Sequence, residues 1–288
     1  MKRFKQARSY PAGFQPAHIE HCRQILANMP CPVRLHWNEQ EVFAEFDGWL
    51  LASDFFAVVC RESQQERFSH YAARLRIYGQ FGQSIPAGWL FAMNYTEQKI
   101  LALLKLVRVL HLLNHCGRHG TDRGLRIDLD PRICYGYSDH IVDFTGDLLT
   151  VLGLPAPLLR FQLFVDWQTL RAGQELVARY RANRHRIGLG GFGEGEHDLA
   201  CLWSLEPDYL VLATRFSQRA VLYPSVREQL LALLPDLVAQ GFLLGVDEIS
   251  CGQMAHLARQ LHARYLAGSL ISEQLNQPAM PSAIAAIS

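Results

Sequence analysis

Short apolar runs alternate with longer helical patterns along most of this sequence. Runs typical of strands occupy 55–60, 73–79, 125–129, 158–164, 186–192, 209–213 and 242–247, and helical patterns occupy 96–115, 138–152, 168–184, 197–205, 224–240 and 252–263. A helix between two strands carries the chain back, so that consecutive strands run parallel. About seven or eight such units in roughly 225 residues match the size of a (β/α)8 barrel. We therefore predict an α/β fold, a TIM-like barrel.

Three zones of the chain differ in hydrophobic pattern and composition. Residues 1–50 contain a helical pattern at 17–29 and strand-like segments at 33–37 and 42–46, which predict a small N-terminal extension. Residues 51–275 carry the alternating pattern of the barrel. Residues 276–288 are rich in Pro, Ala and Ser and have no periodicity, so we expect a flexible tail there.

Charge and cysteine content narrow the class of protein. The 28 Lys and Arg against 27 Asp and Glu leave a formal charge of +1, which gives no overall field for nucleic acid or anionic lipid. The seven Cys form no CxxC pair, which favours reduced thiols over zinc or disulfide frameworks. The basic start lacks the apolar core of an export signal, and the most apolar stretch, 100–113, carries Lys105 and Arg108. We expect a cytoplasmic protein that does not span a membrane.

Three further features have two interpretations each. A glycine-dense turn from Gly188 to Gly195 could bring backbone N–H groups to a phosphate, or it is a loop between strand and helix. The imidazoles of His111, His115 and His119 share one helix face and could hold a transition metal, or they close a helix end. The basic run at 179–186 could meet phosphate or an acidic protein, or it is a solvated helix C-terminus. For each feature the second interpretation is the simpler one, so we expect no bound metal and no nucleic acid.

The segment 187–217 resembles the EAL-domain family of cyclic di-GMP phosphodiesterases. In that family a strand ending DDFGTG precedes a helix and then a strand reading DYLKID. YAARLRIYG (71–79) resembles the EALLRW strand, IDLDP (127–131) the VNLS strand, FQLF (161–164) the EITE strand, LLGVDE (243–248) the AEGVET segment and YLAGSLIS (265–272) the VQGYLFS end. The positions that match in the central segment are Phe192, Gly193, Gly195, Leu199, Leu202, Leu205, Asp208, Tyr209, Leu210 and Phe216. The resemblance covers about residues 51–275.

This resemblance implies a barrel of a particular kind. Its first strand would run antiparallel, and a substrate cleft would lie at the C-terminal ends of the strands. The family hydrolyses cyclic di-GMP with a water activated between two divalent metals, which requires several carboxylates converging from different strands.

The family's ligand positions fall mostly on residues that cannot bind a metal. The glutamate of EAL falls on Ala72, the asparagine of VNLS on Asp128 and the first glutamate of EITE on Gln162. The remaining positions fall on Gly190, Gly191, Val211, Ala213 and Leu244, with a further glutamate position near Asp247. The resemblance therefore implies no catalytic residue, no metal and no cofactor in this chain.

We predict a catalytically inactive EAL-like regulatory protein that acts by binding another protein, whose identity the sequence does not reveal. Cyclic di-GMP binding is in doubt, because Arg76, which matches the arginine of EALLRW, is the main ligand contact that remains, beside Asp128 and Gln162. A sensor that binds cyclic di-GMP or another nucleotide without hydrolysis is the first alternative, and an active phosphodiesterase is the second. EAL domains often pair through a helix near the mouth of the barrel, so the resemblance is also compatible with a homodimer.

Overall fold

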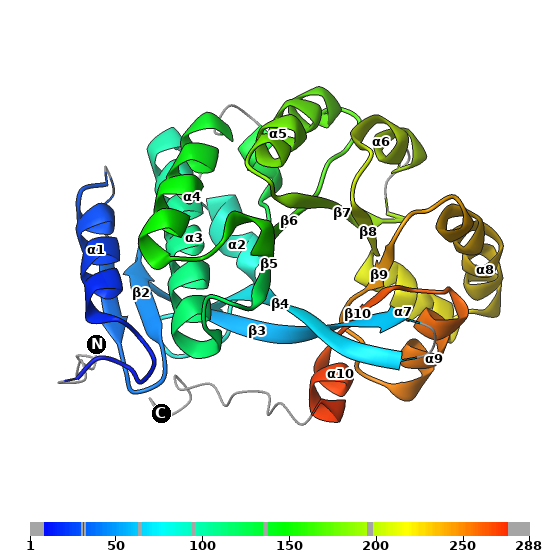
Figure 1. Ribbon diagram of the computed structural model, residues 1–288, viewed down its shortest axis with the longest axis horizontal. Coiled ribbons are helices and arrows are strands. Elements are labelled where there is room, and N and C mark those ends of the chain that lie inside the picture. The colour runs from blue at the N-terminus through cyan, green and yellow to red at the C-terminus, as the bar shows by residue number, and fades with distance from the viewer. Residues whose placement is uncertain are drawn as a thin grey trace.

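The computed structural model describes residues 9–29, 31, 33–62, 65–93, 96–134, 138–194 and 198–275. In this part of the chain ten strands form one sheet, and eight of them close into a barrel surrounded by helices (Figure 1). The barrel strands are β3 (Trp49–Glu62), β4 (Gln65–Tyr78), β5 (Gly124–Asp128), β6 (Leu159–Leu163), β7 (Arg186–Phe192), β8 (Tyr209–Leu212), β9 (Leu244–Val246) and β10 (Tyr265–Ala267). The sheet closes because β3 pairs with both β10 and β4. The predicted TIM-like barrel is confirmed.

The first barrel strand, β3, runs antiparallel to both of its barrel neighbours, β4 and β10. The other adjacent barrel strands pair in parallel. Both β3 and β4 are 14 residues long, well beyond the predicted 55–60 and 73–79. Their ladder continues to the pair Glu62 and Gln65. These outer residues are polar, so an apolar pattern does not reveal them.

Helices cover the outside of the barrel (Figure 1). They are α2 (Ala87–Met93), α3 (Glu97–His119), α4 (Ser138–Leu152), α5 (Leu170–Ala182), α6 (Asp198–Leu205), α7 (Thr214–Leu222), α8 (Pro224–Ala239), α9 (Gly252–Gln260) and α10 (Ser269–Gln274). The prediction missed α2, α7 and α10, and it named no strand at β10. These elements are three to nine residues long, which is too short to establish a period.

The glycines of β7 make room for side chains inside the barrel. A Cβ on Gly188 would lie 2.1 Å from the ring of Tyr209, and one on Gly190 would lie 2.8 Å from the side chain of Gln162. The Tyr209 hydroxyl donates to the Phe161 carbonyl oxygen at 3.0 Å, which holds the ring in place. Close packing therefore accounts for the glycine-dense run, and a phosphate is not needed to explain it.

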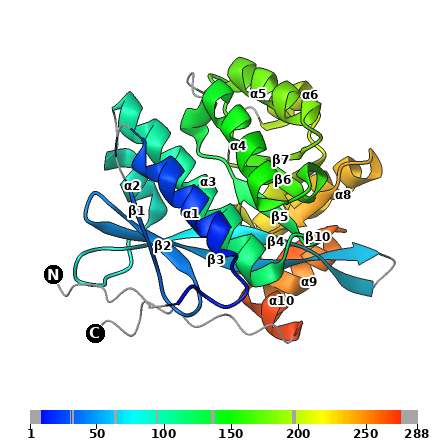
Figure 2. The same ribbon diagram turned by 60° about the vertical axis from the view of Figure 1, so that its left-hand side comes forward.

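The N-terminal extension is built into the barrel wall. β1 (Arg34–Trp37) pairs with β2 (Val42–Phe46), and β2 pairs with the start of β3. Helix α1 (Pro16–Ala27) packs against β1 and α3 (Figure 2). Its buried residues Ile19, Cys22 and Leu26 belong to the same apolar core as the barrel helices. The extension and the barrel therefore share one core. The proposed division at residue 50 stays a prediction, and the predicted tail lies outside the described residues.

Helix α3 is long and apolar enough to cross a membrane by length and composition alone. However, 72% of its most apolar window is buried inside the fold. It lies between the extension and β3, where Leu103, Leu106 and Leu110 are fully buried. Burial within the fold explains this hydrophobicity.

A buried asparagine on α3 helps to join the extension to the barrel. The Asn114 amide donates to the Val42 carbonyl oxygen at 2.7 Å, and its oxygen accepts from the Val42 N–H at 2.9 Å. Asn114 is completely buried. Its amide therefore satisfies both backbone groups of the first residue of β2, where water cannot reach.

We expect Asn114→Ala to lower the free energy of unfolding by about 2 kcal/mol or more, because it leaves these buried groups without partners. Denaturant unfolding would measure the loss. The matched control is Asn183→Ala, which removes an exposed hydrogen bond to the Arg179 carbonyl oxygen and should cost under about 0.5 kcal/mol. Equal losses in the two variants would contradict this role of Asn114.

Candidate functional site

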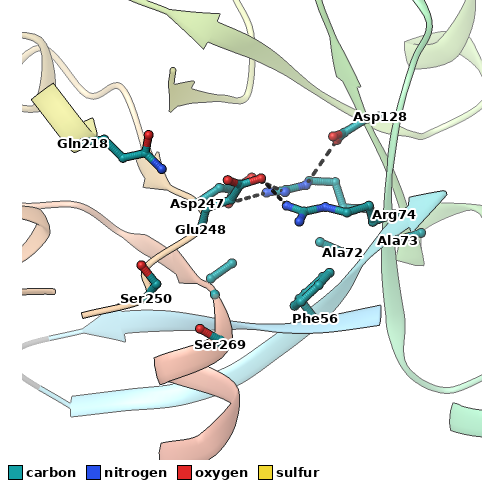
Figure 3. Close-up of a pocket in the computed structure, with 13 residues that line it drawn as sticks. Phe56, Ala72, Ala73, Arg74, Asp128, Gln218, Asp247, Glu248, Ser250 and Ser269 are labelled. Carbon is teal, nitrogen blue, oxygen red and sulfur yellow. Dashed lines mark hydrogen bonds and ion pairs between the residues drawn. The ribbon is translucent and has the colours of Figure 1, made fainter. Parts of the chain in front are cut away.

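A cavity of about 250 Å³ opens at the C-terminal ends of the barrel strands (Figure 3). Its polar lining includes Arg74 from β4, Arg126 and Asp128 from β5, and Asp247 and Glu248 after β9. Ala72 and Phe56 form part of its apolar wall. Side chains from several strands converge here because alternate residues of each strand face the barrel interior.

A buried arginine holds the acidic residues at the base of this cavity. Arg126 is 4% exposed. Its Nη1 donates to Asp247 Oδ1 at 3.2 Å, and its Nη2 donates to the other oxygen of the same carboxylate. Its Nε lies 3.7 Å from Asp128 Oδ1. Burial alone would lower the pKa of Arg126, but these carboxylates outweigh it and raise the pKa. Arg126 therefore stays charged and partly neutralises both aspartates.

Asp128 occupies an environment that disfavours its charge. Its carboxyl is densely surrounded at the base of the cavity, which we call the mouth of the barrel. Its side chain nevertheless remains 47% exposed. Desolvation raises its pKa to about 6, and the opposing effect of Arg126 is smaller. The neighbouring carboxylates of Asp247 and Glu248 act in the same direction as desolvation. This carboxyl therefore binds a proton more readily than a free aspartate.

A second ion pair crosses the mouth. Arg74 on β4 donates to Glu248, which follows β9 and has a backbone φ of 56°. The Arg74 guanidinium also lies 4.8 Å from the centre of the Phe56 ring. Figure 3 shows Arg74 close to Asp247 and Glu248, with Asp128 nearby. Positive and negative side chains thus neutralise one another at the mouth.

The predicted site residues lie at different depths of the barrel. Ala72 and Asp128 line the cavity. Gln162 is 3% exposed, and its Oε1 is buried without a hydrogen-bond partner. Val211 packs with Ala72 inside the barrel. The others are Gly190 and Gly191 near the end of β7, Ala213 directly after β8, and Leu244, which packs in the core between sheet and helices.

Arg76 lies outside this cavity, where the N-terminal extension holds it. Its Nη2 donates to Glu41 Oε1 at 2.8 Å and Oε2 at 2.9 Å, and its Nη1 donates to Asp54. Glu41 is 3% exposed and directly precedes β2. Burial raises the pKa of Glu41, and Arg76 and Arg118 oppose this rise. Sequence reasoning missed Glu41, because 35 residues separate it from its partner.

Of the three histidines of α3, His111 has its own partner, whereas His115 and His119 contact each other and share the rings of Tyr71 and Phe55. His111 Nδ1 lies 2.8 Å from the Ser53 hydroxyl, and His115 Nε2 lies 2.9 Å from the Arg123 carbonyl oxygen. The His119 ring stacks on Tyr71, with 3.8 Å between ring centres. Burial lowers the pKa of His111 to about 3, of His115 to about 4 and of His119 to about 3. Within the described residues, no three His, Cys, Asp or Glu side chains are grouped so as to hold a metal.

Several side chains of the basic run 179–186, which begins in the last turn of α5, contact neighbouring segments. His185 Nδ1 lies 2.9 Å from the Ala156 carbonyl oxygen, and Arg181 donates to the Glu206 carbonyl oxygen. Arg179 lies 3.9 Å from Asp143. These contacts agree with the simpler interpretation of a helix C-terminus, since three of the side chains bind neighbouring loops and helices.

We expect the raised pKa of Asp128 to make folding depend on pH. A carboxyl whose pKa rises from 3.8 to about 6 on folding stabilises the fold below pH 3.8, and the contribution is lost as the pH rises through about 6. The stability of the wild type relative to Asp128→Asn should therefore fall between pH 4 and pH 7. Denaturant unfolding at several pH values measures this difference. Asp236→Asn, at an exposed position on α8, is the control, and a pH-independent difference for Asp128→Asn would contradict the assignment.

The barrel is similar to several solved structures. One is a complex of the PaMucR phosphodiesterase with c-di-GMP, 16% identical over 78% of this chain and 94% of that chain, with a TM-score of 0.66. Others are the FimX EAL domains of Pseudomonas aeruginosa (20% identical, 76% and 88% covered, TM-score 0.58) and Xanthomonas citri (19% identical, 78% and 87% covered, TM-score 0.60), both in complex with c-di-GMP. At 20% identity or below, these likenesses show a shared fold.

A comparison with curated proteins finds no match. The family model of the EAL domain matches residues 51–274, which is most of the chain. The match spans all of the barrel strands except the first two residues of β3, and it includes the strand ends that form the mouth. This chain therefore belongs to the EAL-domain family.

Proposed function

We propose that this chain is a non-hydrolysing EAL-domain protein that regulates another protein by binding it. The single observation that carries the proposal is that arginines occupy the carboxylates at the mouth of the barrel. There, Arg126 and Arg74 bind the carboxylates that would otherwise be available to a metal.

The donor set at the mouth does not fit a pair of divalent ions. Such ions need oxygen ligands, and each requires at least one or two carboxylates besides substrate oxygens. Of the predicted ligand positions, only Asp128 and Asp247 carry a carboxylate, and Arg126 lies beside the first and binds the second. The others carry Ala, Gln, Gly, Val or Leu side chains, of which only the Gln162 amide offers an oxygen.

The size of the cavity also supports a scaffold role. Pockets for drug-sized ligands measure about 300–1,000 Å³, whereas this mouth encloses about 250 Å³. A cyclic dinucleotide is larger than most such ligands. The barrel strands and helices, by contrast, share one large apolar core, which holds the outer surface of the fold in a fixed shape. Because the extension shares this core, the partner surface is better tested by surface substitutions than by deleting residues 1–50.

The purified chain should show no hydrolysis of cyclic di-GMP with Mg²⁺ or Mn²⁺, under conditions where the PaMucR phosphodiesterase is active. Chromatography of the reaction products measures this. In-cell crosslinking followed by reconstitution with the purified partner should give a complex of fixed stoichiometry without metal or nucleotide. Metal-dependent turnover would overturn the first half of the proposal. A complex that formed only with cyclic di-GMP would overturn the second.

A second candidate is metal-independent binding of cyclic di-GMP at the mouth. Phe56 offers a ring for base stacking, and Arg74 beside it offers a charge for phosphate. The solved complexes of related EAL domains with this ligand also favour it.

Isothermal titration calorimetry with and without Mg²⁺ would separate the two candidates. A sensor should bind at micromolar or lower concentrations, and Phe56→Ala should weaken binding by about tenfold or more, as expected for the loss of a stacked ring. Arg215→Gln, at an exposed position on α7 outside the cavity, is the control. Absence of binding at millimolar ligand would exclude the sensor and leave the scaffold.

A further inference from the structure

Three arginines lie side by side on the inner face of the barrel. In the ladder register, Arg126 on β5 is opposite Arg160 on β6, and Arg160 is opposite Arg186 on β7. Their chain neighbours Leu125, Leu159 and Ile187 pack in the core between sheet and helices, so the arginines occupy the opposite, inward face. Arg160 is the second residue of β6 and Arg186 the first of β7. Both therefore lie at the end of the barrel opposite the mouth.

Only one of these three charges is neutralised. Arg126 is bound by Asp247 and approached by Asp128. Among the described residues, the side chains of Arg160 and Arg186 have no carboxylate partner. The Nε and Nη1 atoms of Arg160 are buried without an acceptor. Its guanidinium lies over the Tyr265 ring, 5.7 Å from the ring centre, and this contact supplies no acceptor for those N–H groups.

His70 adds a neutral polar group to the same region. It lies on β4 opposite Gly124, is 2% exposed, and meets the edge of the Tyr265 ring. Its Nδ1 lies 3.0 Å from the Ser69 hydroxyl, while its Nε2 is buried without a partner. Burial first, and then the charges of Arg160, Arg126 and Arg186, hold its pKa well below the usual value. When Ser69 donates to Nδ1, the Nε2 of the neutral ring carries the proton and can donate.

A negative charge would stabilise this arrangement. Neighbouring strands are about 4.8 Å apart, so adjacent cations on β6 and β7 repel each other. Arg186 is exposed to solvent and Arg160 is partly exposed, but the Nε and Nη1 atoms of Arg160 are buried, and buried charged N–H groups without an acceptor are destabilising. The charges that act on the pKa of His70 are all positive.

We propose that a small inorganic anion binds between Arg160 and Arg186 at the N-terminal end of the barrel, with the Nε2–H of His70 as a neutral third donor. Chloride and phosphate share this chemistry. The site differs from the mouth in position and charge, since carboxylates already neutralise the arginines at the mouth. A bound anion would stabilise the folded barrel by mass action, in proportion to its concentration over its dissociation constant.

The test is thermal unfolding of the full chain at constant ionic strength. In one arm gluconate is replaced stepwise by chloride, and in the other by inorganic phosphate. We expect a saturable rise in Tm in at least one arm. Arg186→Gln should raise the concentration at the midpoint by about tenfold or more, because it removes a charge-assisted hydrogen bond. Arg184→Gln, which makes the same charge change two residues away, should leave the midpoint unchanged.

Two outcomes would overturn the site: no saturable response of the wild type in either arm, or equal midpoints for Arg186→Gln and Arg184→Gln. A response to chloride alone would identify a monatomic anion, and a response to phosphate alone an oxyanion. Arg160→Gln should abolish the response. If that variant does not fold, anomalous diffraction from wild-type crystals soaked in bromide provides the second test. A peak between Arg160 and Arg186 supports the proposal, and its absence from a chloride-responsive protein contradicts it.

Discussion

The ion pair between Arg126 and Asp247 determines the chemistry of the whole mouth. Arg126 lies inside the barrel on β5, and Asp247 follows β9 on the far side of the ring. A carboxylate offsets the cost of burying this guanidinium, so the pair commits Asp247 to a structural role. The same guanidinium also lies beside Asp128. Together with the pair of Arg74 and Glu248, it turns a converging set of acidic residues into a nearly neutral surface.

The barrel architecture could be predicted because its long helices and central strands have clear periods. Elements of a few residues, such as β10, have no period to detect, and only the closed sheet reveals them. The family motif located Ala72 and Asp128 at the mouth. It did not locate Arg126, although an arginine alternating with Leu125 and Ile127 in a buried strand indicates an inward-facing charge. Glu41 could not be found at all, because its partner Arg76 is distant in sequence and only the fold brings them together.

The arginines at the two ends of the barrel differ in whether a carboxylate binds them. At the mouth, Arg74 and Arg126 each have a carboxylate from the segment that follows β9. At the opposite end, Arg160 and Arg186 follow one another around the ring without one. The glycines of β7 and the ring of Tyr209 fill the space between these layers. The arginines that carboxylates bind therefore face the mouth, whereas Arg160 and Arg186 lie toward the opposite end of the barrel.

One strand joins the parts of this molecule mechanically. β3 pairs with β4 along almost its whole length, and its other edge pairs first with β2 and then with β10. A force applied to the extension would therefore act on β3, whose hydrogen bonds to β4 and β10 close the ring. The strand that closes the ring is thus also the strand to which β1 and β2 are attached.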